Sequence, residues 1–231
     1  MCQRFSFAIS KEKLKKQFNL SIKQSELQYS YNIAVGQNAY IVDNQSNELK
    51  IVRWGFLPYW AKDEKIGLNF ANAATENIHT QDSFRMAIRR HRCLIFADSF
   101  YEWRRQGRQN QPYRVLLEDN GIIAFAGLYS EWQDADNQIV RSFNILTTAA
   151  NAEMRLFSNR MPLILRTSAE QQNWLSDLPL PQVLELLKPL NDNSLRYYPV
   201  LKEIENLETN FPEIHRQTEL TEEEIEFWKN Y

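Results

Sequence analysis

Cys2 is the residue of this chain whose position is best suited to chemistry, because removal of Met1 would make it a free N-terminal cysteine. Its α-amine and its thiol would then titrate near ~8 and ~8.5, so both have a reactive fraction at neutral pH. An amine condenses with an aldehyde, and a thiol on the neighbouring carbon can close a thiazolidine ring. The alternative is a small, buried thiol at a frayed chain end, which is the commoner situation in an arbitrary protein.

Three later segments carry polar side chains in settings that are unusual for a pure scaffold. Asn72 and Glu76 stand close together just before an expected helix. Glu102 lies between aromatic residues directly after an apolar strand, where burial would raise its pKa and suit it to proton transfer. Arg160 lies beside a turn stiffened by Pro162. Each residue has a structural alternative, namely a helix cap for Asn72, an ion pair for Glu102 and a surface salt bridge for Arg160.

The composition is that of an ordinary globular protein, with 231 residues, 43% hydrophobic and 24% charged. The lysine-rich segment from Ser10 to Lys16 is unlike a signal peptide, and no apolar run approaches the ~18 residues of a membrane span. We therefore expect a cytoplasmic protein that does not bind membranes. The two cysteines, Cys2 and Cys93, do not form a disulfide framework, and no Cys/His cluster has the spacing of a zinc site.

The net charge of −2 hides an uneven distribution along the chain. Residues 1–110 hold 17 basic against 10 acidic side chains (+7), whereas residues 111–231 hold 10 against 19 (−9). The first half could therefore present a basic face to a polyanion such as a nucleic acid. Solvated helix and loop faces would account for the same basic clusters.

The periodicity predicts an α+β fold in a single domain over residues 1–231, with a β-rich, barrel-like mixed or antiparallel sheet. Helices are expected after Ser10, over about 80–90, after the capping-box pattern of Ser168 to Gln171, around Pro181 and after Thr221 with Glu224. Runs rich in β-branched and aromatic residues predict strands at 39–42, 49–54, 93–97, 113–117, 122–129 and 143–147. Cys93 is expected to be a buried strand thiol.

Six short segments together match one family in their order and spacing. They are Met1 to Arg4; Tyr31 to Ala34 with Gln37; Arg53 to Pro58 with Trp60 to Asp63; Asn72-Ala73 with Glu76; Arg92 to Leu94 with Ala97-Asp98 and Phe100 to Trp103; and Ile145 to Thr148 with Ala150-Asn151 and Arg160 to Pro162. The chain resembles the SRAP family of SOS-response-associated peptidases, or abasic-site-processing proteins, whose members start Met-Cys-Gly-Arg. The resemblance spans residues 1 to about 165.

The resemblance implies a protein that binds single-stranded DNA and captures abasic sites in the DNA damage response. Cys2, freed by self-removal of Met1, would form a thiazolidine crosslink with the ring-opened aldehyde and shield the lesion. By position, Asn72 would orient the Cys2 end and Glu102 would transfer protons. The nucleic-acid-binding positions would be Arg4, Trp60, Trp103 and Arg160. The family implies no cofactor and no metal, and we expect a monomer that associates with the nucleoid when DNA is damaged.

The chain departs from the family pattern at several positions. Ser158 stands where the family has a histidine that is associated with Schiff-base and ring-opening steps, and serine cannot shuttle a proton near neutral pH. Ala74 replaces an arginine, which removes one phosphate contact. Gln3 replaces the glycine beside the nucleophile. We expect that the crosslink forms but that its reversal is impaired.

Two other functions agree with parts of this sequence. An amidohydrolase with an N-terminal nucleophile would also use Cys2, with Asn69 or Asn72 as an oxyanion donor, but it would have no use for the segments 53–63 and 100–103. A non-covalent single-stranded DNA-binding module that has lost catalysis would explain Ser158 and Ala74.

Overall fold

Five strands close into a ring at the centre of the molecule. The computed structural model describes residues 2–106 and 109–229. The ring is built from β3 (Asn38–Asp43), β4 (Lys50–Trp54), β6 (Arg92–Ala97), β9 (Ile123–Gln133) and β10 (Ile139–Ala149). Its order is β10-β4-β3-β6-β9, and β9 pairs again with β10 to complete the circuit. The β4–β10 pair is parallel and the other pairs are antiparallel, so the sheet is mixed.

The long strand β10 also holds two short strands, one on each edge. β4 pairs at Ser142 and Phe143, and β5 (Asn72–Ala74) continues along that edge in parallel from Ile145 to Thr147. β9 occupies the other edge as far as Ile145, and β11 (Arg160–Pro162) follows it in antiparallel pairing at 147–149. β10 therefore brings the segments that contain Asn72 and Arg160 to the same end of the ring.

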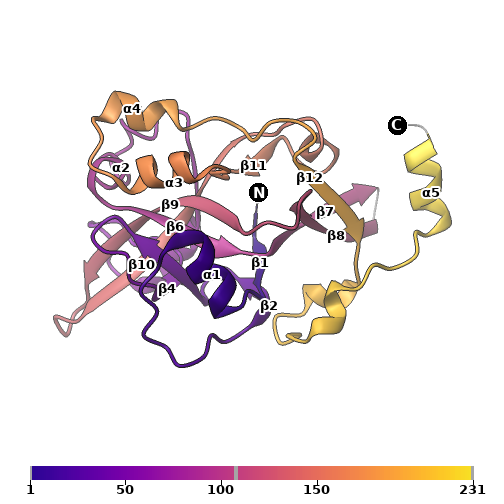
Figure 1. Ribbon diagram of the computed structural model, residues 1–231, viewed down its shortest axis with the longest axis horizontal. Helices are drawn as coiled ribbons and strands as arrows, with labels where there is room; N and C mark the ends of the chain where they lie inside the picture. The colour runs from indigo at the N-terminus through magenta and orange to yellow at the C-terminus, as the bar shows by residue number, and fades with distance from the viewer. Residues whose placement is uncertain (1, 107–108, 230–231) are drawn as a thin grey trace.

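A second sheet lies beside the ring and contains the start of the chain (Figure 1). Its order is β12 (Leu195–Pro199), β8 (Gln109–Leu117), β7 (Ser99–Gln106), β1 (Arg4–Phe7) and β2 (Ser30–Ala34), all in antiparallel pairs. The ring of Phe5 on β1 packs against Trp54 and Phe125, with centroid distances of 5.1 and 5.8 Å. These contacts join the second sheet to the ring of strands.

The helices lie around the sheets, and α1 and α3 begin at side-chain caps. Ser10 caps α1 (Lys11–Phe18) by accepting a hydrogen bond from Lys13 N. Thr167, one residue earlier than the predicted Ser168, caps α3 (Ser168–Leu175) in a capping box with Glu170. The predicted proline start is confirmed in α4 (Leu180–Glu185). The final helix α5 (Glu222–Lys229) follows Thr221, and the side chain of Glu224 lies outside the described residues.

The helix predicted over 80–90 is much shorter than expected. Only Ala87–Arg90 forms a regular α-helix, α2, and residues 82–86 form turns. Phe84 packs edge-on against Phe56 and Phe70, with centroids 5.3 and 5.9 Å away. These aromatic contacts stabilise the turns, so residues 82–86 do not extend the helix by another turn. The remaining short elements are 3₁₀ helices at η1 (Glu64–Phe70), η2 (Met154–Leu156), η3 (Lys202–Glu205) and η4 (Pro212–His215).

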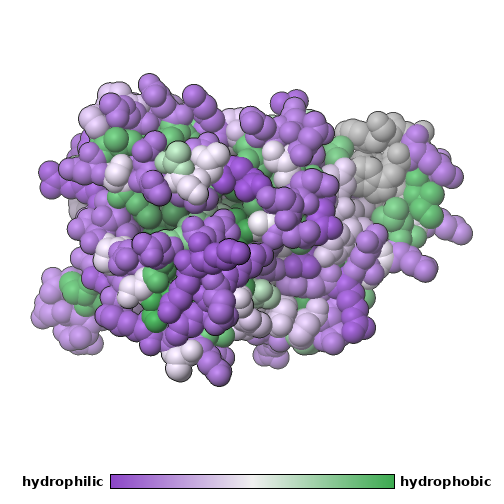
Figure 2. Space-filling view, in the orientation of Figure 1, coloured by the Kyte–Doolittle hydropathy of each residue, from purple (hydrophilic) through white to green (hydrophobic). Residues whose placement is uncertain are grey.

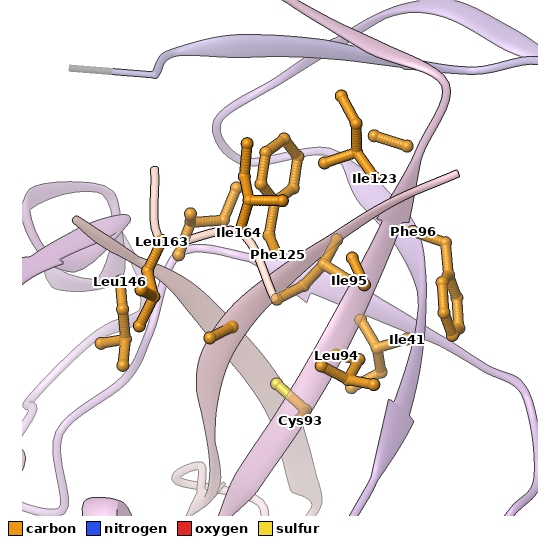
Figure 3. Packing of buried hydrophobic residues seen from close by; sticks show 14 of the residues in the cluster. Ile41, Cys93, Leu94, Ile95, Phe96, Ile123, Phe125, Leu146, Leu163 and Ile164 are labelled. Atoms are coloured by element: carbon orange, nitrogen blue, oxygen red, sulfur yellow. The ribbon is translucent and has the colours of Figure 1, made fainter. Parts of the chain in front are cut away.

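Apolar side chains from all five ring strands fill the interior. Figure 3 shows side chains from β3, β6, β9 and β10 gathered there, with the sulfur of Cys93 among them. Gly127 is required at this point, because a Cβ there would lie 2.3 Å from Asn144 O and 2.4 Å from Ile95 Cδ1. The face in Figure 2 is largely hydrophilic, with apolar side chains only in small patches. The predicted single-domain α+β fold is confirmed.

Arg92 is a fully buried charged residue that joins two helix ends to the ring of strands. Its guanidinium donates to Ile88 O and Arg89 O at the end of α2, and to Trp174 O and Ser176 O at the end of α3. Carbonyls at helix C-termini have no partner within the helix and carry partial negative charge. The arginine therefore supplies donors to four carbonyls at these helix ends, one of which, Ser176 O, also accepts from Leu178 N at 2.9 Å.

The segment after β12 returns to cover β2, β7 and β8. Ile204 and Ile214 are buried there against Tyr101 and Val200. Asn32 Nδ2 donates to Ile204 O, Asn206 O and Thr209 O at 3.2, 2.9 and 2.9 Å. The C-terminal part of the chain is thus fixed beside the N-terminal strand. Among the described residues, no helix is long and apolar enough to cross a lipid bilayer.

The burial of Cys93 predicts an alkaline loss of stability. Burial raises the pKa of its thiol, and Asp43 raises it further, so the folded chain keeps a proton that the unfolded chain loses above ~8.5. The free energy of unfolding therefore falls as pH rises above that value, by about 1.4 kcal/mol per pH unit for one thiol. Denaturant unfolding of Cys93→Ala at pH 7 to 10.5 should give a shallower fall than wild type. Parallel stability curves for the two proteins would contradict this expectation.

Candidate active site

Cys2 lies two residues before the start of β1 and is fully buried. Its thiol donates to Arg4 O at 3.7 Å, which is a weak local contact. Burial raises the pKa of the thiol, and the Glu102 carboxylate raises it further. At neutral pH the thiol is therefore protonated, and it needs a proton acceptor before it can act as a nucleophile.

Asn72 fixes the backbone of Cys2 from the ring of strands. Its Nδ2 donates to Cys2 O at 2.8 Å, across 70 residues of sequence. The backbone of Asn72 is itself held by β5, which pairs with Ile145 on β10. Asn72 Oδ1 is buried and has no hydrogen-bond partner among the described residues. The asparagine thus orients the cysteine and presents an acceptor oxygen next to it.

Glu102 lies on β7, the strand that pairs with β1. Phe5 is opposite Phe100 in this pairing, and the same register continued places Gln3 opposite Glu102. Glu102 is only 6% exposed, and its charge acts on the Cys2 thiol. The predicted trio of Cys2, Asn72 and Glu102 is therefore brought together from three different strands or strand ends. The three side chains combine a thiol, an amide and a carboxylate at one point.

Ser158 and Arg160 lie on the other side of β10 from β5. Ser158 Oγ accepts a hydrogen bond from Arg160 N at 3.2 Å, and within the described part of the chain it makes no hydrogen bond to Cys2. The Arg160 guanidinium bonds both oxygens of Glu76, at 3.1 and 2.9 Å, and also Thr147. This bidentate contact lowers the pKa of Glu76.

The remaining predicted nucleic-acid-binding residues lie in different surroundings. Arg4 is half-buried and donates to Asn32 Oδ1 and Glu205 O, both at 2.8 Å. Trp103 Nε1 donates to the Glu205 carboxylate at 3.0 Å. Trp60 is 43% exposed and packs edge-on against Phe70 at 5.6 Å. Arg4 and Trp103 therefore share a partner, whereas Trp60 presents a free aromatic surface.

Glu205 and its neighbours are the part of this region that the sequence did not indicate. Glu205 contacts Arg4, Trp103 and Asn110, although at least 95 residues separate it from each of them. Its carboxylate opposes the lowering of the Arg4 pKa that burial causes. No local pattern signals a contact of this range. Within residues 2–106 and 109–229, no group of three or more His, Cys, Asp or Glu side chains could hold a metal ion.

Comparison with known proteins assigns this chain to a family. The family model "SOS response associated peptidase (SRAP)" matches residues 1–207, and the chain belongs to this family.

Curated relatives and a solved structure agree with this assignment. The chain is 36% identical over 221 residues to the abasic site processing protein YoqW of Bacillus subtilis (strain 168), covering 93% of this chain and 98% of that protein. It is 25% identical to the abasic site processing protein HMCES of Xenopus tropicalis, over 74% of this chain and 58% of that protein. A crystal structure of a protein from Bacteroides thetaiotaomicron superposes with a TM-score of 0.86 at 26% identity, covering 94% of this chain and all of the other.

Proposed function

We propose that this protein acts in the response to DNA damage by capturing abasic sites in single-stranded DNA through a covalent bond to Cys2. The observation that carries the proposal is the convergence of Cys2, Asn72 and Glu102 from separate strands. The family membership and the printed names of the relatives support the class of lesion. Self-removal of Met1 would supply the free α-amine that the reaction needs.

The proposed chemistry joins the amine and the thiol of Cys2 to one aldehyde carbon. The amine adds to the aldehyde to give a carbinolamine, and Glu102 in its acid form donates a proton so that the hydroxyl leaves as water. The thiol then adds to the resulting iminium carbon and gives its proton to the Glu102 carboxylate. The product is a thiazolidine, one water is released, and Glu102 is again protonated.

Glu102 suits both proton transfers because of its position. Glu102 is only 6% exposed, and its carboxyl lies close enough to Cys2 to donate the proton that the first transfer requires. Its influence on the thiol pKa places its charge where the second transfer needs an acceptor. The hydrogen bond from Asn72 to Cys2 O holds the cysteine backbone still while both bonds form. The enzyme-like part of the function therefore depends on a few side chains and requires no cofactor.

The proposed DNA partner would be held without sequence preference by a monomer. Arginine side chains such as Arg4 and Arg160 contact phosphates, and exposed aromatic rings such as Trp60 stack on bases. Ser158 in place of a histidine leaves the ring-opening step without an imidazole, so we infer that the adduct is long-lived.

Intact-mass measurement after incubation with an oligonucleotide that contains one abasic site tests the proposal. We expect wild-type protein to lack Met1 and to gain the mass of the oligonucleotide minus one water. Cys2→Ala should gain no mass, and an intact oligonucleotide should leave wild type unchanged. An unmodified wild-type mass together with equal binding of abasic and intact DNA would instead support the non-covalent binding module.

A further inference from the structure

Both candidate phosphate-contacting arginines already have an acidic partner within the protein. Arg160 makes a bidentate ion pair with Glu76, and the two side chains are 27% and 54% exposed. Arg4 donates to the backbone oxygen of Glu205, whose negative charge also acts on the guanidinium. The Glu205 carboxylate accepts from Trp103 Nε1 at 3.0 Å and from Asn110 Nδ2 at 3.3 Å.

Contacts within the fold hold both of these pairs in place. Glu205 ends η3, which is anchored by the buried Ile204 and by the Asn32 amide that donates to carbonyls on both sides of Glu205. Arg160 cannot easily turn away from Glu76, because its guanidinium is also bonded to Thr147 on β10. The Glu76 carboxylate therefore remains paired with Arg160 when no DNA is present. Glu205 remains beside Arg4 through its backbone oxygen, and its carboxylate acts on the guanidinium through its charge.

We propose that Glu76 and Glu205 are internal counterions that compete with DNA phosphates for Arg160 and Arg4 and so keep the affinity for intact single-stranded DNA low. The inference rests on the proposed function, because it uses the DNA-binding positions named there. Stable retention of DNA would then depend on the bond at Cys2, which only a lesion aldehyde can form. The two glutamates would thereby set the selectivity for damaged over intact DNA.

The glutamates are expected to lower the affinity because arginine–phosphate contacts supply much of the affinity of proteins for nucleic acids. A free arginine that neutralises a phosphate releases a condensed counterion, and this release drives association at low salt. An arginine already paired with a carboxylate adds no net positive charge, and the phosphate must replace existing hydrogen bonds. The residue at position 74 is alanine, so the charge of Glu76 is not offset by an arginine there.

Glutamine substitutions test the proposal because they remove the charge and keep the acceptor oxygen. Glu76→Gln, Glu205→Gln and the double variant would be compared with Glu131→Gln. The control breaks a similar exposed ion pair, Glu131 with Arg141 at 2.6 Å, between β9 and β10. The measurement is fluorescence anisotropy of an intact single-stranded oligonucleotide between 50 and 200 mM NaCl. Thermal unfolding of each variant would verify that it is folded.

We expect each of the two single variants to bind intact DNA about 3- to 10-fold more tightly than wild type at low salt, with a salt slope steeper by about 0.7. The double variant should combine both changes, and Glu131→Gln should stay within about 2-fold of wild type. When intact and abasic oligonucleotides are mixed, intact DNA should inhibit adduct formation by the variants more strongly than adduct formation by wild type. Affinities equal to that of the control would overturn the inference.

The same assays separate this inference from the function on which it rests. Tighter binding of intact DNA by the variants without any covalent adduct in wild type would support the counterion role and reject the covalent function. An adduct in wild type with unchanged affinities in the variants would reject the counterion role alone. If neither wild type nor variants bound intact DNA, the counterion role would be rejected, whatever the adduct assay showed.

Discussion

Glu102→Gln is expected to slow formation of the abasic-DNA adduct by about 10²- to 10⁴-fold, the usual contribution of general acid and base catalysis. Glutamine has nearly the same shape as glutamate, but it can neither donate the proton that removes the carbinolamine hydroxyl nor accept the thiol proton. The rate would be measured by single-turnover quenching onto a denaturing gel. The rate of adduct formation should also lose the part of its pH dependence that a titrating carboxyl group causes.

A second readout distinguishes catalysis from a purely electrostatic influence. Burial raises the pKa of the Cys2 thiol, and the negative charge of Glu102 raises it further, so removal of that charge should lower the pKa and speed alkylation of Cys2 by iodoacetamide. Slower adduct formation combined with faster alkylation would identify Glu102 as a proton carrier. If both reactions became faster, Glu102 would act only through its charge and the proposed mechanism would be wrong. Cys2→Ala sets the background of both assays.

Arg92→Met is expected to lower the free energy of unfolding by about 3–5 kcal/mol, because each buried carbonyl that loses its donor costs about 1–3 kcal/mol. The arginine is fully buried and donates to four backbone carbonyls at the ends of α2 and α3. Methionine fills part of the space, but it provides no donor to these carbonyls. Ser176 O keeps Leu178 N as a donor, whereas the buried carbonyls of Ile88 and Trp174 lose the donor that Arg92 supplies, which is the costly outcome. Urea unfolding followed by far-ultraviolet circular dichroism would measure the change.

The matched control for this prediction is the same substitution two residues earlier. Arg90 is exposed at the end of α2, so Arg90→Met should change stability by no more than about 0.5 kcal/mol. Similar effects at the two positions would mean that the charge at the helix end matters and that the buried hydrogen bonds do not. A small effect of Arg92→Met alone would mean that water replaces the guanidinium at the carbonyls.

The ring of strands was largely predictable, because its strands are short apolar runs between clear turn signals. Strands β1 and β12 of the second sheet were harder to predict. Residues 4–7 and 195–199 form strands only because β7 and β8 provide partners, and their own sequences are mixed. The helix over 80–90 was predicted too long, since the contacts of Phe84 with Phe56 and Phe70 outweigh local helix propensity.

The candidate site was predictable by resemblance but not by local pattern. Cys2, Asn72 and Glu102 lie near each other because three strands meet, and periodicity cannot reveal such long-range pairing. The bond between Arg4 and Glu205 is a stronger example. A glutamate at the end of a 3₁₀ turn resembles any exposed acidic residue until the fold places it beside an arginine at the opposite end of the chain.

The contact between Arg4 and Glu205 also has a consequence for the order of events during biosynthesis. The two residues are 201 positions apart, so the ribosome must add nearly the whole chain before the contact can form. At roughly 5–20 residues per second, the first residues wait on the order of 10–40 s for their C-terminal neighbours. A methionine that stays in front of Cys2 during this interval would mask its amine from aldehydes in the cell until the surrounding protein is complete.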